Sequence, residues 1–183
     1  MTIKFTAIVA ATSLAVLAGV ANGAAKRNEP VYRAVEASRE GALELLKTIA
    51  GVDSGSGDIP GGERVESILA ERLKAAGAEV RSVPAEVANV APNLVAVFHG
   101  TGKAKVLIIA HVDTVYGPGT VAKRPIRVEG DRMYGPGVGD EKGGVVNAVV
   151  ALEILHRLGF KDYATITVML DGSEELGHPA PRS

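Results

Sequence analysis

The hydrophobic pattern of the chain changes from a helical to an extended period partway along its length. Over residues 36–50, apolar side chains recur at i, i+3, i+4 and i+7, which is the spacing of one helix face: Ala42, Leu45, Leu46 and Ile49. A second stripe of this period covers residues 65–76 and stops at Gly77, a residue typical of helix ends. We therefore predict two amphipathic helices, separated by a Gly- and Ser-rich loop over residues 51–63.

Short apolar runs bounded by turn residues follow the second helix. They predict strands at residues 78–83, 93–99 and 105–111. A hairpin is expected over residues 125–135, and a third helix with a wide apolar face begins after Asp140 and ends at Gly159. The last run, residues 163–170, is apolar at nearly every position, as in strands that are buried on both faces. Strands that alternate with helices predict an α/β fold.

The first residues have the layout of a secretory signal peptide. Lys4 is the only charge ahead of an apolar run over residues 7–21, and small residues follow it at 21–24. The run is shorter than the roughly 18–20 residues that span a bilayer, which disfavours an uncleaved membrane anchor. We predict a signal peptide at residues 1–23, a periplasmic or secreted protein, and no membrane association after its removal.

Composition excludes several classes of protein. Apolar residues make up 46% of the chain, which is too many for a disordered protein. The formal net charge of −1, without a cluster of Lys and Arg, gives no footprint for nucleic acid. There is no cysteine, so disulfides and a lipid-modified N-terminus are excluded. The loop at residues 51–63 lacks the Gly-Lys-Ser/Thr ending of a phosphate-binding P-loop.

Side chains that could perform chemistry gather at the ends of the predicted elements. His111 and Asp113 end a strand, where residues i and i+2 point to the same side. A carboxylate beside a histidine can hold one ring nitrogen while the other binds a metal ion. The alternative is a purely structural hydrogen-bonded pair.

Two further acidic pairs have both a structural and a functional interpretation. Asp140 stands at the predicted N-cap of the third helix, where a carboxylate accepts free backbone N–H groups. Glu141 could be an exposed acid in the first helical turn. Glu174 and Glu175 follow the last strand, either as a solvated loop or with separate tasks, one binding a cation and the other taking a proton from water.

Taken together, these clusters predict one site for hard or borderline cations at one edge of the sheet. Nitrogen and oxygen ligands without sulfur suit zinc, cobalt or manganese. A carboxylate that bridges two ions roughly 3.5–4 Å apart would make a two-metal hydrolase site.

The motifs also resemble a known family. HVDTVYGPGTVAKRPIRVEGDRMYGPGVGDEKGG and KDYATITVMLDGSEE are similar to segments of the co-catalytic zinc exopeptidases and deacylases, and most similar to their glutamate carboxypeptidases. The resemblance runs from about residue 30 to residue 175. It implies an α/β fold with a mixed, mostly parallel sheet flanked by helices, and a cofactor of two zinc ions.

The resemblance also implies a role for each site residue. His111 corresponds to a ligand of one zinc ion, and Asp113 to the catalytic acid beside it. Asp140 corresponds to the bridging carboxylate, which is followed in family members by a non-proline cis peptide. Glu174 corresponds to the general base, and Glu175 to a ligand of the other zinc ion.

The activity implied is removal of a C-terminal amino acid, with glutamate favoured, from small peptides or from N-acyl or folate-like conjugates. The alternatives are an N-acyl amino acid deacylase and an inactive, metal-binding remnant. Family members often dimerise through a second domain and carry further ligands beyond the Glu pair. Residues 24–183 correspond to the N-terminal part of the catalytic domain, so we expect a truncated chain, ended by a frameshift or early stop, with little activity of its own.

Overall fold

The computed structural model describes residues 26–177, so the predicted signal peptide lies outside the described residues. Its main helices are α2 (Glu29–Ala50), α3 (Ile59–Ala75), α4 (Thr120–Lys123) and α5 (Gly143–Arg157). Its strands are β1 (Glu79–Val83), β2 (Asn93–His99), β3 (Lys105–His111), β4 (Arg127–Glu129), β5 (Arg132–Tyr134) and β6 (Thr165–Asp171). Within residues 26–177, no helix is long and apolar enough to cross a membrane.

The first two helices begin earlier than the hydrophobic stripes indicate, because capping residues set their starts. The side chain of Asn28 accepts a hydrogen bond from the Val31 N–H at 3.2 Å, and α2 continues from there. Asp58 likewise accepts from the Gly61 N–H at 3.1 Å, so α3 takes up residues 59–63 of the predicted loop. Each helix also has a proline in its first turn, where no backbone N–H is needed. The loop between the helices therefore shortens to residues 51–58.

The larger sheet has the strand order β1-β2-β6-β3, with a separate hairpin formed by β4 and β5. The predicted mixed sheet is confirmed, but its expected mostly parallel pairing is wrong for the described residues. β1–β2 and β2–β6 are antiparallel, and only β3–β6 is parallel. The short loops at residues 84–92 and 100–104 turn the chain back on itself, whereas the long crossover through α5 returns β6 in the direction of β3.

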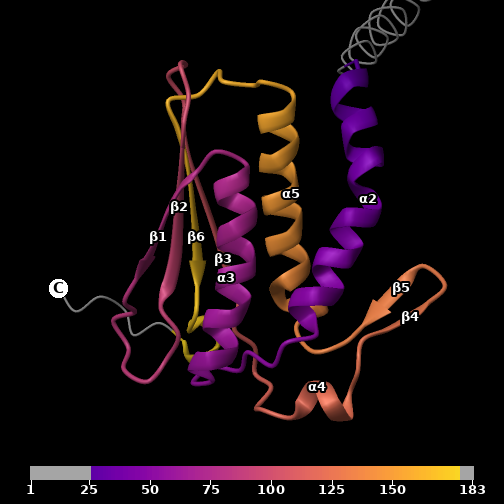
Figure 1. Cartoon of the computed structure of the whole chain (residues 1–183), viewed down its shortest axis with the longest axis vertical. Helices are drawn as coiled ribbons and strands as arrows, with labels where there is room; N and C mark the ends of the chain where they lie inside the picture. The colour runs from indigo at the N-terminus through magenta and orange to yellow at the C-terminus, as the bar shows by residue number, and fades with distance from the viewer. Residues whose placement is uncertain (1–25, 178–183) are drawn as a thin grey trace, which may run out of the picture.

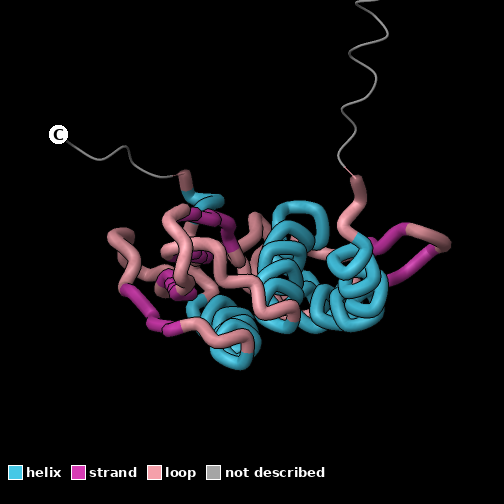
Figure 2. The backbone as a smooth tube through the Cα atoms, turned by 90° about the horizontal axis from the view of Figure 1, so that it is seen from above, coloured by secondary structure: helices cyan, strands magenta, loops and turns pink. Residues whose placement is uncertain are grey.

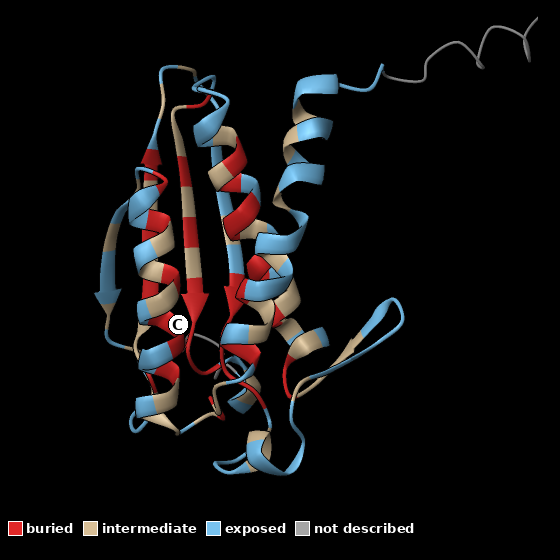
Figure 3. Ribbon diagram, turned by 45° about the vertical axis from the view of Figure 1, so that its right-hand side comes forward, coloured by how far each residue is buried: buried red, intermediate tan, exposed pale blue. Residues whose placement is uncertain are grey.

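The helices cover one face of this sheet. α3 and α5 pack on the face that carries the buried side chains of β2 and β6, and α2 packs against α5 (Figures 1 and 2). The prediction that the last strand is buried on both faces is wrong here. Ile166, Val168 and Leu170 are buried, but the residues between them are only half-buried (Figure 3). On β3 the uncovered side chains of Leu107 and Ile109 are 61% and 64% exposed.

The parallel pairing of β3 and β6 decides where the polar motifs meet. In this register His111 lies opposite Asp171, so both strands end at the same edge of the sheet. The segments that follow them, and α4 with the β4–β5 hairpin, lie at this lower end of the molecule in Figure 1. The edge that open α/β sheets use for their sites is therefore the one that collects the candidate residues.

Candidate metal centre

His111 and Asp113 lie side by side at the end of β3. Both are buried, with 7% and 2% of their surface exposed. Nδ1 of His111 lies 3.2 Å from Oδ1 of Asp113 and 3.2 Å from its carbonyl oxygen. The other ring nitrogen, Nε2, lies 3.2 Å from Oδ1 of Asp140. The imidazole is thus held on one side and directed toward a second carboxylate on the other.

The carboxylate of Asp113 also organises the turn after β6. Its Oδ1 accepts a hydrogen bond from the Glu174 N–H, and its Oδ2 accepts one from the Glu175 N–H, both at 3.1 Å. The Ser56 hydroxyl donates to Oδ2 at 2.5 Å. One buried carboxylate therefore ties the histidine, the backbone of the Glu pair and the loop after α2 into a single unit.

The turn that carries Asp140 differs from the predicted N-cap. Asp140 has an extended backbone (φ −132°, ψ 100°), and α5 starts only at Gly143, after a kinked turn over Val138–Lys142. The peptide bond from Asp140 to Glu141 is cis, as the resemblance implies. The Asp140 carboxylate is thus free of capping, largely exposed, and directed at His111.

Glu141 is not the exposed first-turn acid that helix electrostatics alone would favour. Its Oε1 accepts a hydrogen bond from the backbone N–H of His111 at 3.0 Å. The contact joins the Asp140 turn to the last residue of β3. The segment before Asp140 also packs closely against the segment that follows β3. A Cβ at Gly137, where φ is +70°, would lie 2.6 Å from Cγ2 of Thr114.

His111, Asp140 and Glu175 form a group that could hold a metal ion. One donor atom from each lies within 4.8 Å of the others. The structure therefore brings together the three residues predicted as ligands, with Glu174 in the same turn as Glu175 and its Oε2 3.9 Å from Nε2 of His111. Their roles as ligands and as a base stay predictions.

The electrostatics of this group favour a bound cation. Burial lowers the pKa of His111, but the hydrogen bond to Asp140 and the nearby carboxylates of Asp113, Glu141 and Glu174 outweigh it, so the pKa is raised. The pKa of Glu175 is also raised, by burial and by the neighbouring acids. A divalent ion would relieve the repulsion among the carboxylates that surround this imidazole. The donor set of nitrogen and oxygen atoms therefore fits a metal such as zinc.

Sequence reasoning missed Lys142, although it lies in the Asp140 motif. Its side chain is fully buried, and its Nζ donates to the carbonyls of Ile49 (2.9 Å) and Val52 (3.0 Å) at the end of α2. Burial lowers the pKa of Lys142 to about 8, against the opposing effect of Asp53. The lysine anchors the Asp140 turn to α2, and no local signal distinguishes it from a solvated helix-start lysine.

The loop at residues 51–58 also supports the centre, a role that the absence of a P-loop pattern does not predict. Ser54 Oγ donates to the carbonyl of Val112 at 2.8 Å, beside the contact between Ser56 and Asp113. A Cβ at Gly55 would lie 2.2 Å from the carbonyl oxygen of Tyr116, so only glycine permits this approach. The Gly-Ser alternation is the one sequence feature that reflects the close packing.

A buried acid lies on α3. Glu66 is 4% exposed, and in the described part of the chain its Oε1 has no hydrogen-bond partner. Burial, with Glu63 and Asp171 adding to it, raises the pKa of Glu66 to about 8. Its carboxyl group is therefore mostly protonated at neutral pH.

This proton makes stability depend on pH. Because the folded state holds it more tightly than the unfolded chain does, its contribution is fully present below about pH 4 and is lost as the pH rises to about 8. We expect Glu66→Gln to match the parent at pH 4 and to exceed its free energy of unfolding by about 4 kcal/mol at pH 8. Urea unfolding of the metal-free proteins at the two pH values measures this. Glu71→Gln, on the exposed side of α3, is the control, and parallel pH curves for parent and Glu66→Gln would contradict the expectation.

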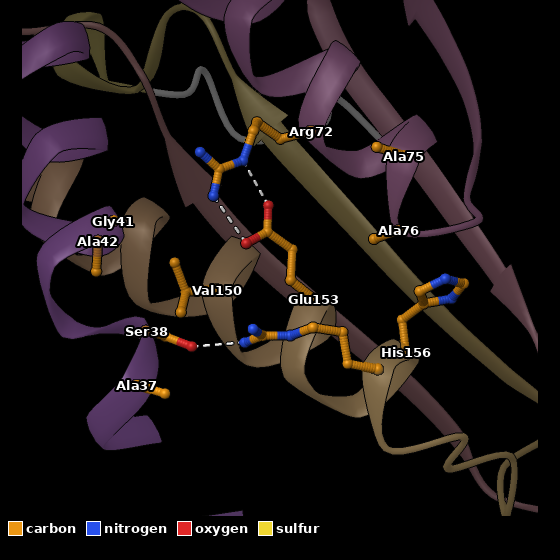
Figure 4. Close-up of a pocket in the computed structure, with 11 residues that line it drawn as sticks. Ala37, Ser38, Gly41, Ala42, Arg72, Ala75, Ala76, Val150, Glu153 and His156 are labelled. Atoms are coloured by element: carbon orange, nitrogen blue, oxygen red, sulfur yellow. Dashed lines mark hydrogen bonds and ion pairs between the residues drawn. The ribbon is translucent and has the colours of Figure 1, made fainter. Parts of the chain in front are cut away.

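A cavity of about 340 Å³ lies elsewhere, among α2, α3 and α5 (Figure 4). Arg72 and Glu153 form a two-pronged ion pair there, at 2.5 and 2.8 Å, and Arg157 donates to the Ser38 hydroxyl at 2.5 Å. His156 points away from the ion pair in Figure 4. The two arginines of this cavity are bound to Glu153 and Ser38, and none of the candidate ligands lines it.

The chain is similar in sequence to known peptidases. Residues 107–182 match the peptidase family M20/M25/M40. The chain is 37% identical over 174 residues to Carboxypeptidase G2 of Pseudomonas sp. (strain RS-16), covering 94% of this chain and 41% of that protein. It therefore spans about two fifths of the length of this relative.

Solved structures show the same fold. Human carnosine dipeptidase 1 superposes with a TM-score of 0.70 and 22% identity, over 84% of this chain and 36% of that one. An M20 family metallo-carboxypeptidase from Sulfolobus solfataricus superposes with a TM-score of 0.64 and 20% identity, over 74% and 31%. The identity to Carboxypeptidase G2 extends along nearly the whole of this chain, and residues 107–182 match peptidase family M20/M25/M40, so the chain is similar to members of this family.

Proposed function

We propose that the protein is a zinc-dependent exopeptidase that removes a C-terminal amino acid, glutamate by preference, from small peptides or N-acyl conjugates. The observation that carries this proposal is the convergence of His111, Asp140 and Glu175, with Glu174 beside them. The identity to a protein named Carboxypeptidase G2 supports the carboxypeptidase activity. The signal-like pattern at residues 1–23 supports action in the periplasm or outside the cell.

The proposed mechanism assigns each residue a task that its position allows. His111, Asp140 and Glu175 would hold zinc, which when bound lowers the pKa of water and polarises a carbonyl group. Asp113 keeps the imidazole oriented through Nδ1 and fixes the backbone of both glutamates. Glu174, half exposed, takes a proton from the attacking water onto its carboxylate and passes it to the leaving amine.

A metal titration tests the proposal. The full chain is stripped with a chelator and titrated with Zn²⁺ and with Co²⁺, and the loaded protein is then assayed on an N-acyl glutamate. We expect Glu175→Gln to weaken zinc binding by at least about tenfold, because the lost charge is a direct ligand. Glu44→Gln, an exposed acid of α2, should bind as the parent does. Equal zinc affinity of the parent and Glu175→Gln would contradict the proposed centre.

A further inference from the structure

A second cavity lies between α4 and the β4–β5 hairpin, at the end of the molecule that holds the candidate metal centre. Its volume is about 380 Å³. Three cations line it, Lys123, Arg124 and Arg127, together with the rings of Tyr116 and Tyr134. Proline and glycine complete the lining, and no acidic residue contributes to it. A small cavity with this charge favours an anionic ligand.

The walls of this cavity are the chain segments that leave the metal centre. Tyr116 follows closely after Asp113, and Pro136 comes shortly before Asp140. The close approach of Gly137 to Thr114 locks these two segments together between the cavity and the centre. The cavity and the candidate ligands therefore share the segments that follow Asp113 and precede Asp140.

The cavity is held by specific contacts. The carboxylate of Asp53 accepts hydrogen bonds from the Gly119 N–H (2.8 Å) and the Val121 N–H (2.9 Å), which fixes the start of α4. At the base of the hairpin, a Cβ on Gly135 would lie 2.1 Å from Cδ1 of Ile126, so the two segments pack as closely as glycine permits. The scaffold that presents the cations is therefore closely packed.

The cations are placed to receive an acid. Cζ of Arg127 lies 4.5 Å from the centre of the Tyr134 ring, and Cζ of Arg124 lies 5.8 Å from that of Tyr116. A guanidinium over a ring keeps its N–H edge available for a carboxylate. Arg127 already pairs with Glu129 at 2.7 Å. Within residues 26–177, Lys123 and Arg124 form no ion pair, so they are the two charges available to a ligand.

We propose that this cavity binds a carboxylate group of the substrate through Lys123 and Arg124, so that the protein selects acidic substrates. The inference rests on the proposed function, because the ligand is taken to be the substrate of the proposed exopeptidase. The volume suits a short dicarboxylate, such as the glutaryl part of a glutamate residue. The two cations can pair with the carboxylate, while the tyrosine rings flank its methylene chain.

Binding of glutarate to the metal-free full chain tests this. A chelator is kept present so that no carboxylate is bound by a metal ion, and ionic strength is held constant. Calorimetry and amide chemical shifts should show glutarate binding with shifts confined to residues 115–136, and glutaramide binding at least about tenfold more weakly. We expect the double variant Lys123→Gln, Arg124→Gln to lose about tenfold in glutarate affinity. Arg132→Gln, an exposed cation of the same hairpin outside the cavity, should keep the parent affinity.

Two results would overturn the inference. One is equal glutarate affinity in the parent and the double variant. The other is inorganic phosphate binding as tightly as glutarate, which would make the cavity a general anion site. The assay contains no metal and no turnover, so its outcome is independent of whether zinc binding or hydrolysis fails. The double variant should also take up zinc as the parent does.

Discussion

Replacing Glu174 by glutamine is expected to slow metal-dependent hydrolysis by about 10²–10⁴-fold and to leave zinc affinity nearly unchanged. A positioned general base contributes a rate factor of this order, and glutamine cannot accept the proton. The backbone N–H of residue 174 would still donate to Asp113, so the turn and the neighbouring Glu175 stay in place. The measurement is the initial rate on an N-acyl glutamate at saturating zinc, with zinc affinity from competition with a coloured chelator.

The pair of readouts separates two roles for Glu174. Loss of both activity and zinc affinity would make Glu174 a ligand rather than the base. An unchanged rate would remove it from the mechanism. Glu36→Gln, an exposed acid in α2, controls for the general effect of removing one negative charge.

Replacing Asp113 by alanine is expected to lower the free energy of unfolding of the metal-free chain by about 3 kcal/mol. Buried donors without partners cost about 1–3 kcal/mol each, and the variant deprives the Glu174 and Glu175 N–H groups and the Ser56 hydroxyl of their shared acceptor. The same change releases Nδ1 of His111. We therefore also expect zinc affinity to fall by about 10–100-fold, as when a carboxylate behind a metal-bound histidine is removed.

Urea unfolding without metal measures the first effect, because bound zinc would otherwise add its own stabilisation. Chelator competition measures the second. Asp131→Ala, on the exposed tip of the hairpin, should change neither. A metal-free Asp113→Ala chain as stable as the parent would show that the shared carboxylate does not hold the turn.

Local pattern predicted the elements well wherever an element has one apolar face. The strands at residues 93–99 and 105–111 have the predicted bounds, and the hairpin forms within residues 125–135. The pattern missed the early helix starts, since capping by Asn28 and Asp58 acts through single polar atoms and leaves no hydrophobic period. It also missed α4, which is a single exposed turn held by Asp53.

The local hydrophobic pattern did not predict the order or the direction of the strands. β6 enters between β2 and β3 although it is last of the three along the chain. Alternating apolar residues report which face of a strand is buried, but they do not report which strand lies beside it. The mostly parallel sheet was expected from resemblance, and the short loops around β2 decided otherwise for the described residues.

The sequence by itself determined the chemistry of the candidate centre. The residues at positions 111, 140 and 175 supply nitrogen and oxygen donor atoms, and their places at element ends bring them to one edge of the sheet. Only the tertiary structure decided how those donors are held. Asp113 supports backbone groups some sixty residues away, and Lys142 donates to the end of α2. Such contacts join segments that share no local pattern, because a hydrogen bond depends on where two atoms meet after folding.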